Sequence, residues 1–143
     1  MTQGQPDPAV VRRHLAALRE ALMNLRRHTG VSAAELSANA DLRWTIERGL
    51  QLCLQNALDI ATHVAAACGL DAPDYSRAIE RLAELGLLSA EFAARLRPIA
   101  GFRNVLVHGY LQVDQEIVAS VVNERLGDLE EFAGCVESYL ERL

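Results

Sequence analysis

Apolar residues recur every three or four positions along almost the whole chain, which is the period of helices that pack on one side. The first such run contains Val11, Leu15, Leu18, Leu22 and Leu25. No run shows the two-residue alternation that is typical of a half-buried strand. The sequence also has no internal repeat and no glycine-rich phosphate loop. The pattern therefore predicts an all-α protein.

Polar caps and glycines mark the ends of the expected helices. The expected N-caps are Asp7, Asp41, Asp74, Ser89 and Asp114, and the expected helix-ending glycines are Gly30, Gly69 and Gly86. Ser32 and Glu35 have the spacing of a capping box for a short helical turn. Pro98 and Gly101 predict a kink or a new start just before Phe102. Because the connections are short, neighbouring helices should be antiparallel, and we expect an up-and-down bundle of about five helices.

The length and composition suit one domain with a substantial core. The chain has 143 residues, of which 50% are hydrophobic, so we expect a single helical domain over residues 1–143 with a flexible N-terminus over about residues 1–7. No apolar run approaches the roughly 20 residues that span a membrane, and the N-terminus lacks a signal-peptide pattern. These features predict a cytoplasmic protein. Cys53, Cys68 and Cys135 lack a disulfide or zinc spacing, so free buried thiols are expected.

The charge of the chain bears on what it can bind. The net charge is −5, and all 14 residues of the Lys+Arg count are arginine. An acidic chain is a poor nonspecific binder of nucleic acid, because that affinity comes from neutralising phosphates. Arg95, Arg97 and Arg103 lie close in sequence, and a local cluster of this kind could offset the overall charge.

The segment from Gly101 to Tyr110 carries the densest candidate chemistry. It contains Arg103, Asn104, His108 and Tyr110 among valine, leucine and glycine. An unpaired arginine is costly in an apolar core, and a solvated surface does not need a Val-Leu-Val run, so the mixture suggests the wall of a cleft. Arginine offers a fork of donors that suits phosphate, and histidine exchanges a proton near neutral pH. Together these groups suit cleavage of a phosphodiester.

The spacing within this segment limits how its residues can cooperate. Asn104 and His108 are four apart and share a helix face, so Asn104 can orient the imidazole. Arg103 and His108 are five apart, about 140° around the axis, so they need a broad cleft or a distorted helix. Each residue also has a simpler explanation: a helix C-cap for His108, a salt bridge for Arg103 and a boundary aromatic for Tyr110.

The predicted long helix, over about residues 42–68, carries a second polar pair and a broad apolar surface. Asp59 and His63 are four apart, which fits either an ordinary surface pair or a polar contribution to the same cleft. The apolar residues run most of the way round this helix, which favours burial by a second copy; they are Leu50, Leu52, Leu54, Leu58 and Ile60. We see no arrangement of residues for a metal, so no metal or other cofactor is expected.

The pattern Arg-x4-His-x-Tyr, formed by Arg103, His108 and Tyr110, resembles the signature of the HepT-type toxins of the HEPN superfamily. The stretch from Arg43 to His63 resembles the family's second helix, and Leu111 to Leu143 resembles its last. The resemblance implies a homodimeric ribonuclease toxin of a type VII-like HepT/MntA toxin–antitoxin system. Its partner would be a minimal nucleotidyltransferase, MntA-like, that acts as the antitoxin.

The resemblance also implies roles for single residues. His108 and Arg103 would be catalytic in metal-independent cleavage of RNA, with Asn104 and Asp59 in support. Tyr110 would accept AMP from the antitoxin. The alternative is a non-catalytic helical module that binds a nucleotide or serves as partner of a nucleotidyltransferase, and the net charge of −5 favours this alternative.

Overall fold

The computed structural model describes residues 4–109 and 113–143, and every regular element in these ranges is a helix. The helices are α1 (Pro8–Arg26), α2 (Ala33–Ala38), α3 (Ala40–Ala67), α4 (Tyr75–Glu84), α5 (Ala90–Leu96), α6 (Pro98–His108), α7 (Gln115–Glu124) and α8 (Leu126–Glu141). The all-α prediction is confirmed. The described segments outnumber the expected five or so because two expected helices are each divided and the expected short turn forms α2.

The divisions have local causes. The expected fourth helix ends at Leu96, and Pro98 begins α6, since a proline has no N–H to continue the helical ladder. Gly101 lies inside α6, so the predicted start just before Phe102 is wrong. The expected last helix is divided at Arg125 into α7 and α8, where neither a proline nor a capping side chain marks the break.

Most of the predicted caps are confirmed. Asp7, Asp74, Ser89 and Asp114 each accept a hydrogen bond from a backbone N–H of the following first turn. Ser32 and Glu35 form the capping box of α2. The long helix is different: Asn39 Oδ1 accepts from the N–H of Leu42 at 3.1 Å, so Asn39 is the N-cap and Asp41 lies in the first turn of α3.

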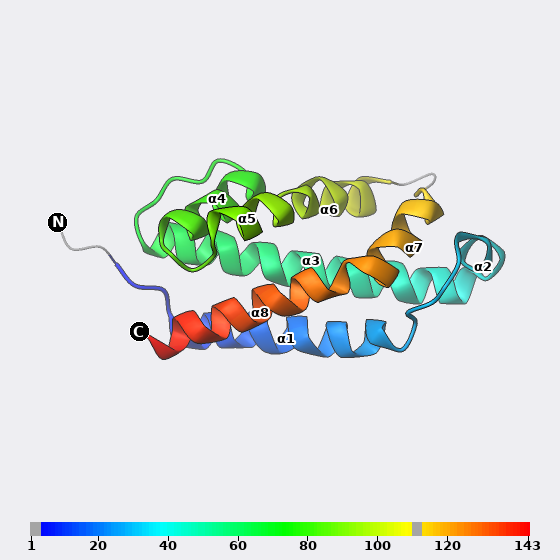
Figure 1. The fold of residues 1–143 in the computed structure, drawn as a ribbon, viewed down its shortest axis with the longest axis horizontal. Coiled ribbons are helices and arrows are strands. Elements are labelled where there is room, and N and C mark those ends of the chain that lie inside the picture. The colour runs from blue at the N-terminus through cyan, green and yellow to red at the C-terminus, as the bar shows by residue number, and fades with distance from the viewer. Residues whose placement is uncertain (1–3, 110–112) are drawn as a thin grey trace.

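Helix α3 is the central element of the bundle (Figure 1). Helix α1 runs along one flank of it and α6 along the other, while α8 packs against α1 and α3. The short helices α4 and α5 lie near the C-terminal end of α3, and α2 contacts α7 at the opposite end. One side of α3, which carries the exposed residues Arg48 and Leu52, stays uncovered between α1 and α6. Arg103 of α6 contacts α3 through Gln55.

The same chain covers most of the apolar surface of α3. Leu50, Leu54, Leu58 and Ile60 are fully buried within the single copy. Only Leu52, 38% exposed, remains of the set that predicted a second copy. No helix within residues 4–109 and 113–143 is both long enough and apolar enough to cross a membrane.

Candidate functional site

Helix α6 places Arg103 and His108 on different sides of its axis. Arg103 is half-buried and turns toward α3 and α4, whereas His108 is exposed in the last turn. This matches the separation of about 140° that their spacing gives on a helix. Gly109 follows as the C-cap. Tyr110 lies outside the described residues.

Three neighbours hold the guanidinium of Arg103. Its Nε donates to Gln55 Oε1 at 2.9 Å, and its Nη1 donates to Asn104 Oδ1 at 3.0 Å. Its central carbon lies 5.3 Å from the centroid of the Tyr75 ring, within range of a cation–π contact. These contacts come from α3, α4 and α6, so the packing of three helices fixes the direction of the fork.

Gln55 connects this group to Asp59. The Gln55 side-chain amide donates to Asp59 Oδ1 at 2.7 Å and, at 3.4 Å, to the hydroxyl of Tyr75. Asp59 is therefore linked to Arg103 through Gln55, and its supporting role stays a prediction. His63 does not complete the pair that its spacing suggested, because its Nε2 accepts from the backbone N–H of Asp7 at 3.2 Å.

Sequence reasoning missed Gln55 and Tyr75. Gln55 precedes Asp59 by four residues, a spacing that brings side chains together on a helix, and this signal could have found it. Nothing in the sequence connects Tyr75 to a residue 28 positions later. Asn104 was expected to orient His108; its carbonyl oxygen instead accepts from Arg103, and the orienting role stays a prediction.

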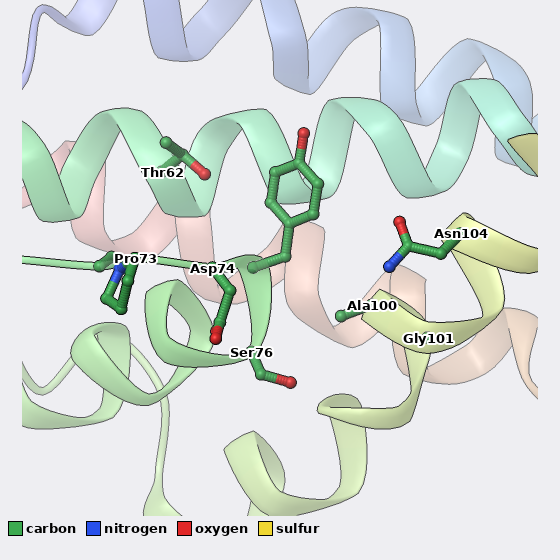
Figure 2. Close-up of a pocket in the computed structure, with 9 residues that line it drawn as sticks. Thr62, Pro73, Asp74, Ser76, Ala100, Gly101 and Asn104 are labelled. Carbon is green, nitrogen blue, oxygen red and sulfur yellow. The ribbon is translucent and has the colours of Figure 1, made fainter.

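A groove of about 590 Å³ lies between α3, the start of α4 and α6 (Figure 2). Thr62 of α3, Asp74 before α4 and Asn104 of α6 line it, together with Tyr75. Asn104 and Tyr75 thus face both the guanidinium and the groove.

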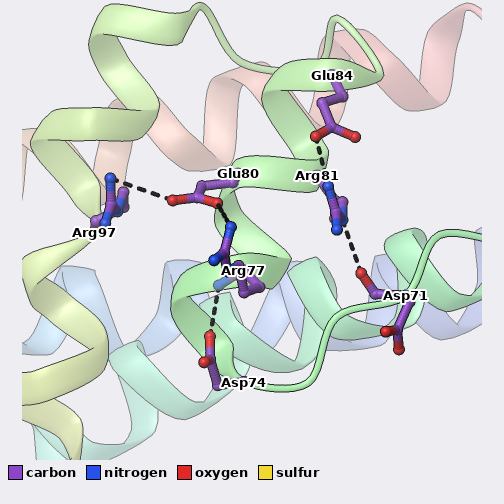
Figure 3. Close-up of polar contacts among 7 residues, drawn as sticks. All are labelled: Asp71, Asp74, Arg77, Glu80, Arg81, Glu84 and Arg97. Atoms are coloured by element: carbon purple, nitrogen blue, oxygen red, sulfur yellow. Dashed lines mark hydrogen bonds and ion pairs between the residues drawn. The ribbon is translucent and has the colours of Figure 1, made fainter.

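The arginines near the signature do not form a cationic cluster. Arg97 pairs with Glu80 at 3.2 Å, and Glu80 also pairs with Arg77 (Figure 3). Arg95 pairs with Asp128 and Glu131 on α8. Arg103 has no acidic side chain within ion-pair distance among the described residues. The expectation of a cluster of Arg95, Arg97 and Arg103 is therefore wrong, because Arg103 alone of these three has no acidic partner among the described residues.

The cysteines do not contribute to this site. All three are free, with Cys53 and Cys68 buried and Cys135 half-buried. Burial raises the pKa of the Cys53 thiol to about 12, which keeps it from acting as a nucleophile near neutral pH. In residues 4–109 and 113–143, no group of three or more His, Cys, Asp or Glu side chains could hold a metal ion.

The model of one protein family, described as ribonuclease HepT-like, matches residues 18–136, which contain Arg103 and His108. The chain belongs to the ribonuclease HepT-like family. The resemblance found in the signature is thereby confirmed, and it extends from the middle of α1 to α8.

Relatives and solved structures agree with this assignment. The chain is 26% identical over 125 residues to an mRNA nuclease HepT of Shewanella oneidensis, covering 87% of this chain and 93% of the relative. It is 26% identical over 136 residues to a tRNA nuclease HepT of Aphanizomenon flos-aquae, covering 94% and 92%. A solved complex of a tri-AMPylated Shewanella oneidensis HEPN toxin with an MNT antitoxin has a TM-score of 0.78 at 22% identity, covering 90% of this chain and 97% of that one. This likeness confirms the helical fold.

Proposed function

We propose that this protein is a metal-independent ribonuclease toxin in which Arg103 and His108 from two copies share one cleft. The observation that carries the proposal is the oriented guanidinium of Arg103 in the Arg-x4-His signature of a ribonuclease HepT-like chain. Arg103 donates to two fixed acceptors, Gln55 and Asn104, and no acid neutralises it among the described residues. Such a group is prepared for a phosphate oxygen rather than for structural pairing.

The chemistry follows from the two side chains. His108 removes the proton from a ribose 2′-hydroxyl as general base, and the 2′-oxygen attacks the adjacent phosphorus. Arg103 stabilises the negative charge that develops on the phosphate oxygens. The bond to the 5′-oxygen breaks, and that oxygen takes up a proton. The products are a 2′,3′-cyclic phosphate end and a 5′-hydroxyl end.

A homodimer would allow Arg103 and His108 to act on the same phosphate, which is difficult within one copy. Arg103 and His108 point to different sides of α6, so a partner copy would supply the complementary group across the cleft. Exposed apolar side chains at the start of α3 and on α6 support a contact between copies: Trp44 is 69% exposed and Val105 46%. Sedimentation that detects only monomer at micromolar concentration would remove the two-sided cleft.

The proposed partner is a minimal nucleotidyltransferase antitoxin, MntA-like, acting in the cytoplasm. The solved relative that is AMPylated and bound to an MNT antitoxin supports this part of the proposal. Tyr110, two residues after His108, would accept the AMP. The added phosphate would bring negative charge to the cleft and could occupy Arg103, which silences the toxin without unfolding it.

Growth and mass spectrometry test these roles in cells. Expression of the chain alone should stop growth, and co-expression of its MntA-like nucleotidyltransferase should restore it. Arg103→Ala and His108→Ala should be harmless at equal expression, and Arg103→Lys should be impaired because a point charge does not replace the bidentate fork.

Co-expressed toxin should gain about 329 Da per AMP on the peptide with Tyr110. AMP on Tyr75 or Tyr139 would refute the role of Tyr110. Undiminished toxicity of His108→Ala would favour a non-catalytic module over a ribonuclease.

A further inference from the structure

A second groove lies between the C-terminal half of α1 and the first half of α3. Its volume is about 320 Å³, and its lining includes Arg27, His28 and Arg48 but no acidic residue. Gly49 lets the two helices approach closely here, because a Cβ at this position would lie 2.8 Å from Cδ2 of Leu25. Three basic side chains thus border a narrow groove in a chain whose net charge is −5.

The two arginines of the groove have no acidic partner within residues 4–109 and 113–143, and no acidic residue lines the groove. Most other arginines are matched with acids, as Figure 3 shows for α4; those in ion pairs are Arg19, Arg26, Arg77, Arg81, Arg95, Arg97 and Arg125. No ion pair among the described residues involves Arg27 or Arg48, and both are exposed. Residues 1–3 and 110–112 carry no acidic side chain. The groove therefore presents uncompensated positive charge.

The groove lies on the same uncovered side of α3 as the candidate site. Arg48 and Leu52 line the groove, while Gln51 donates to the carbonyl of Leu106 on α6 at 3.3 Å. One turn further, Gln55 holds Arg103. Arg48 and Gln55 are seven residues apart, about 10 Å along α3. A nucleic-acid strand with one phosphate at Arg103 could therefore place a neighbouring phosphate at Arg48.

We propose that Arg27, His28 and Arg48 form a binding site for backbone phosphates of single-stranded RNA beyond the bond that is cleaved. The inference rests on the proposed ribonuclease function and adds where the strand runs. Arginine forks suit phosphate oxygens, and His28 adds a further donor. Contacts of this kind position a strand without reading its bases. The site supplies the affinity for RNA that the overall negative charge of the chain does not.

Salt dependence of binding tests the site directly. All proteins carry His108→Ala, which prevents cleavage of the probe. The dissociation constant for a fluorescein-labelled single-stranded oligoribonucleotide is measured by fluorescence anisotropy over a range of NaCl concentrations. Arg27→Gln with Arg48→Gln should reduce the salt slope by about 1.4, because each lost contact removes about 0.7 for a single strand. If the variant and the parent bind equally at about 1 M salt, this difference in slope corresponds to about 25-fold weaker binding by the variant at roughly 0.1 M salt. Arg12→Gln with Arg13→Gln is the matched control, since it makes the same change of charge on exposed residues of α1 outside the groove.

Equal affinity and slope in the groove variant and the control variant would overturn the site. A groove variant that sediments as monomer, while the control stays dimeric, would also overturn it by making the groove a contact between copies. In the chain with His108 intact, the groove variant should raise KM for long RNA and leave cleavage of a dinucleotide unchanged, because a dinucleotide is too short to reach the groove. Failure of the unchanged protein to cleave either substrate would refute the ribonuclease function, whereas the anisotropy comparison would still decide the site.

Discussion

Replacing Gln55 with leucine tests whether Arg103 must be held in place. The substitution removes the 2.9 Å bond from Arg103 Nε and the 2.7 Å bond to Asp59 while keeping a side chain of similar size. Arg103 keeps its contacts with Asn104 and the Tyr75 ring. The side chain should therefore stay in the site, but its guanidinium should no longer be held in one orientation. A hydrogen bond to a charged group contributes about 1.5–3 kcal/mol, which corresponds to roughly 10- to 150-fold in the rate of cleavage.

Gln51→Leu provides the matched control for this experiment. Gln51 lies one turn earlier on α3, is also half-buried, and donates to the backbone of Leu106 instead of Arg103. Single-turnover cleavage of RNA should be slow in Gln55→Leu and close to normal in Gln51→Leu, with similar unfolding temperatures. In an Arg103→Ala background, Gln55→Leu should cause no further loss, because the two residues act as one unit. Equal rates for the two leucine variants, or an additive loss in the double variant, would refute the positioning role.

Three further predictions concern metal, packing and thiol chemistry. Cleavage should survive EDTA, and a loss on chelation that magnesium restores would reveal a metal site. Gly49→Ala should lower the free energy of unfolding by about 1–3 kcal/mol through overpacking against Leu25. Gly134→Ala, which meets nothing within 4 Å, should raise it by up to about 1 kcal/mol in denaturant unfolding; the reverse order would contradict this packing. Iodoacetamide should alkylate half-buried Cys135 well before Cys53, because burial raises the pKa of Cys53 to about 12, and mass spectra showing Cys53 first would disprove the order.

The sequence predicted local structure well because local rules govern it. The capping box at Ser32 and the caps at Asp7, Asp74, Ser89 and Asp114 depend on residues within one turn. Asn39 and Asp41 are both of residue types that cap helices, and Asn39, which is also the C-cap of α2, is the one that caps α3. The break at Arg125 has no local signal.

Only part of the candidate site could be predicted from the sequence, because the rest of it depends on contacts between separate helices. Arg103 and His108 stand out because they are close together in sequence and have the family spacing. The residues that hold Arg103 come from α3 and α4, and their contact with it depends on how three helices pack. The ion pairs of Arg95 and Arg97 likewise join separate helices, so a cluster that looked basic in sequence is neutralised in the fold.

The most direct test of the account is RNA cleavage by the purified protein and by His108→Ala, in EDTA, with analysis of the product ends. The account predicts that the unchanged protein leaves 2′,3′-cyclic phosphate and 5′-hydroxyl ends. His108→Ala should be slower by on the order of 10²–10³ at unchanged thermal stability. Cleavage at the same rate in both proteins, or no cleavage by the unchanged protein as a dimer, would contradict the assignment of Arg103 and His108 as the catalytic groups.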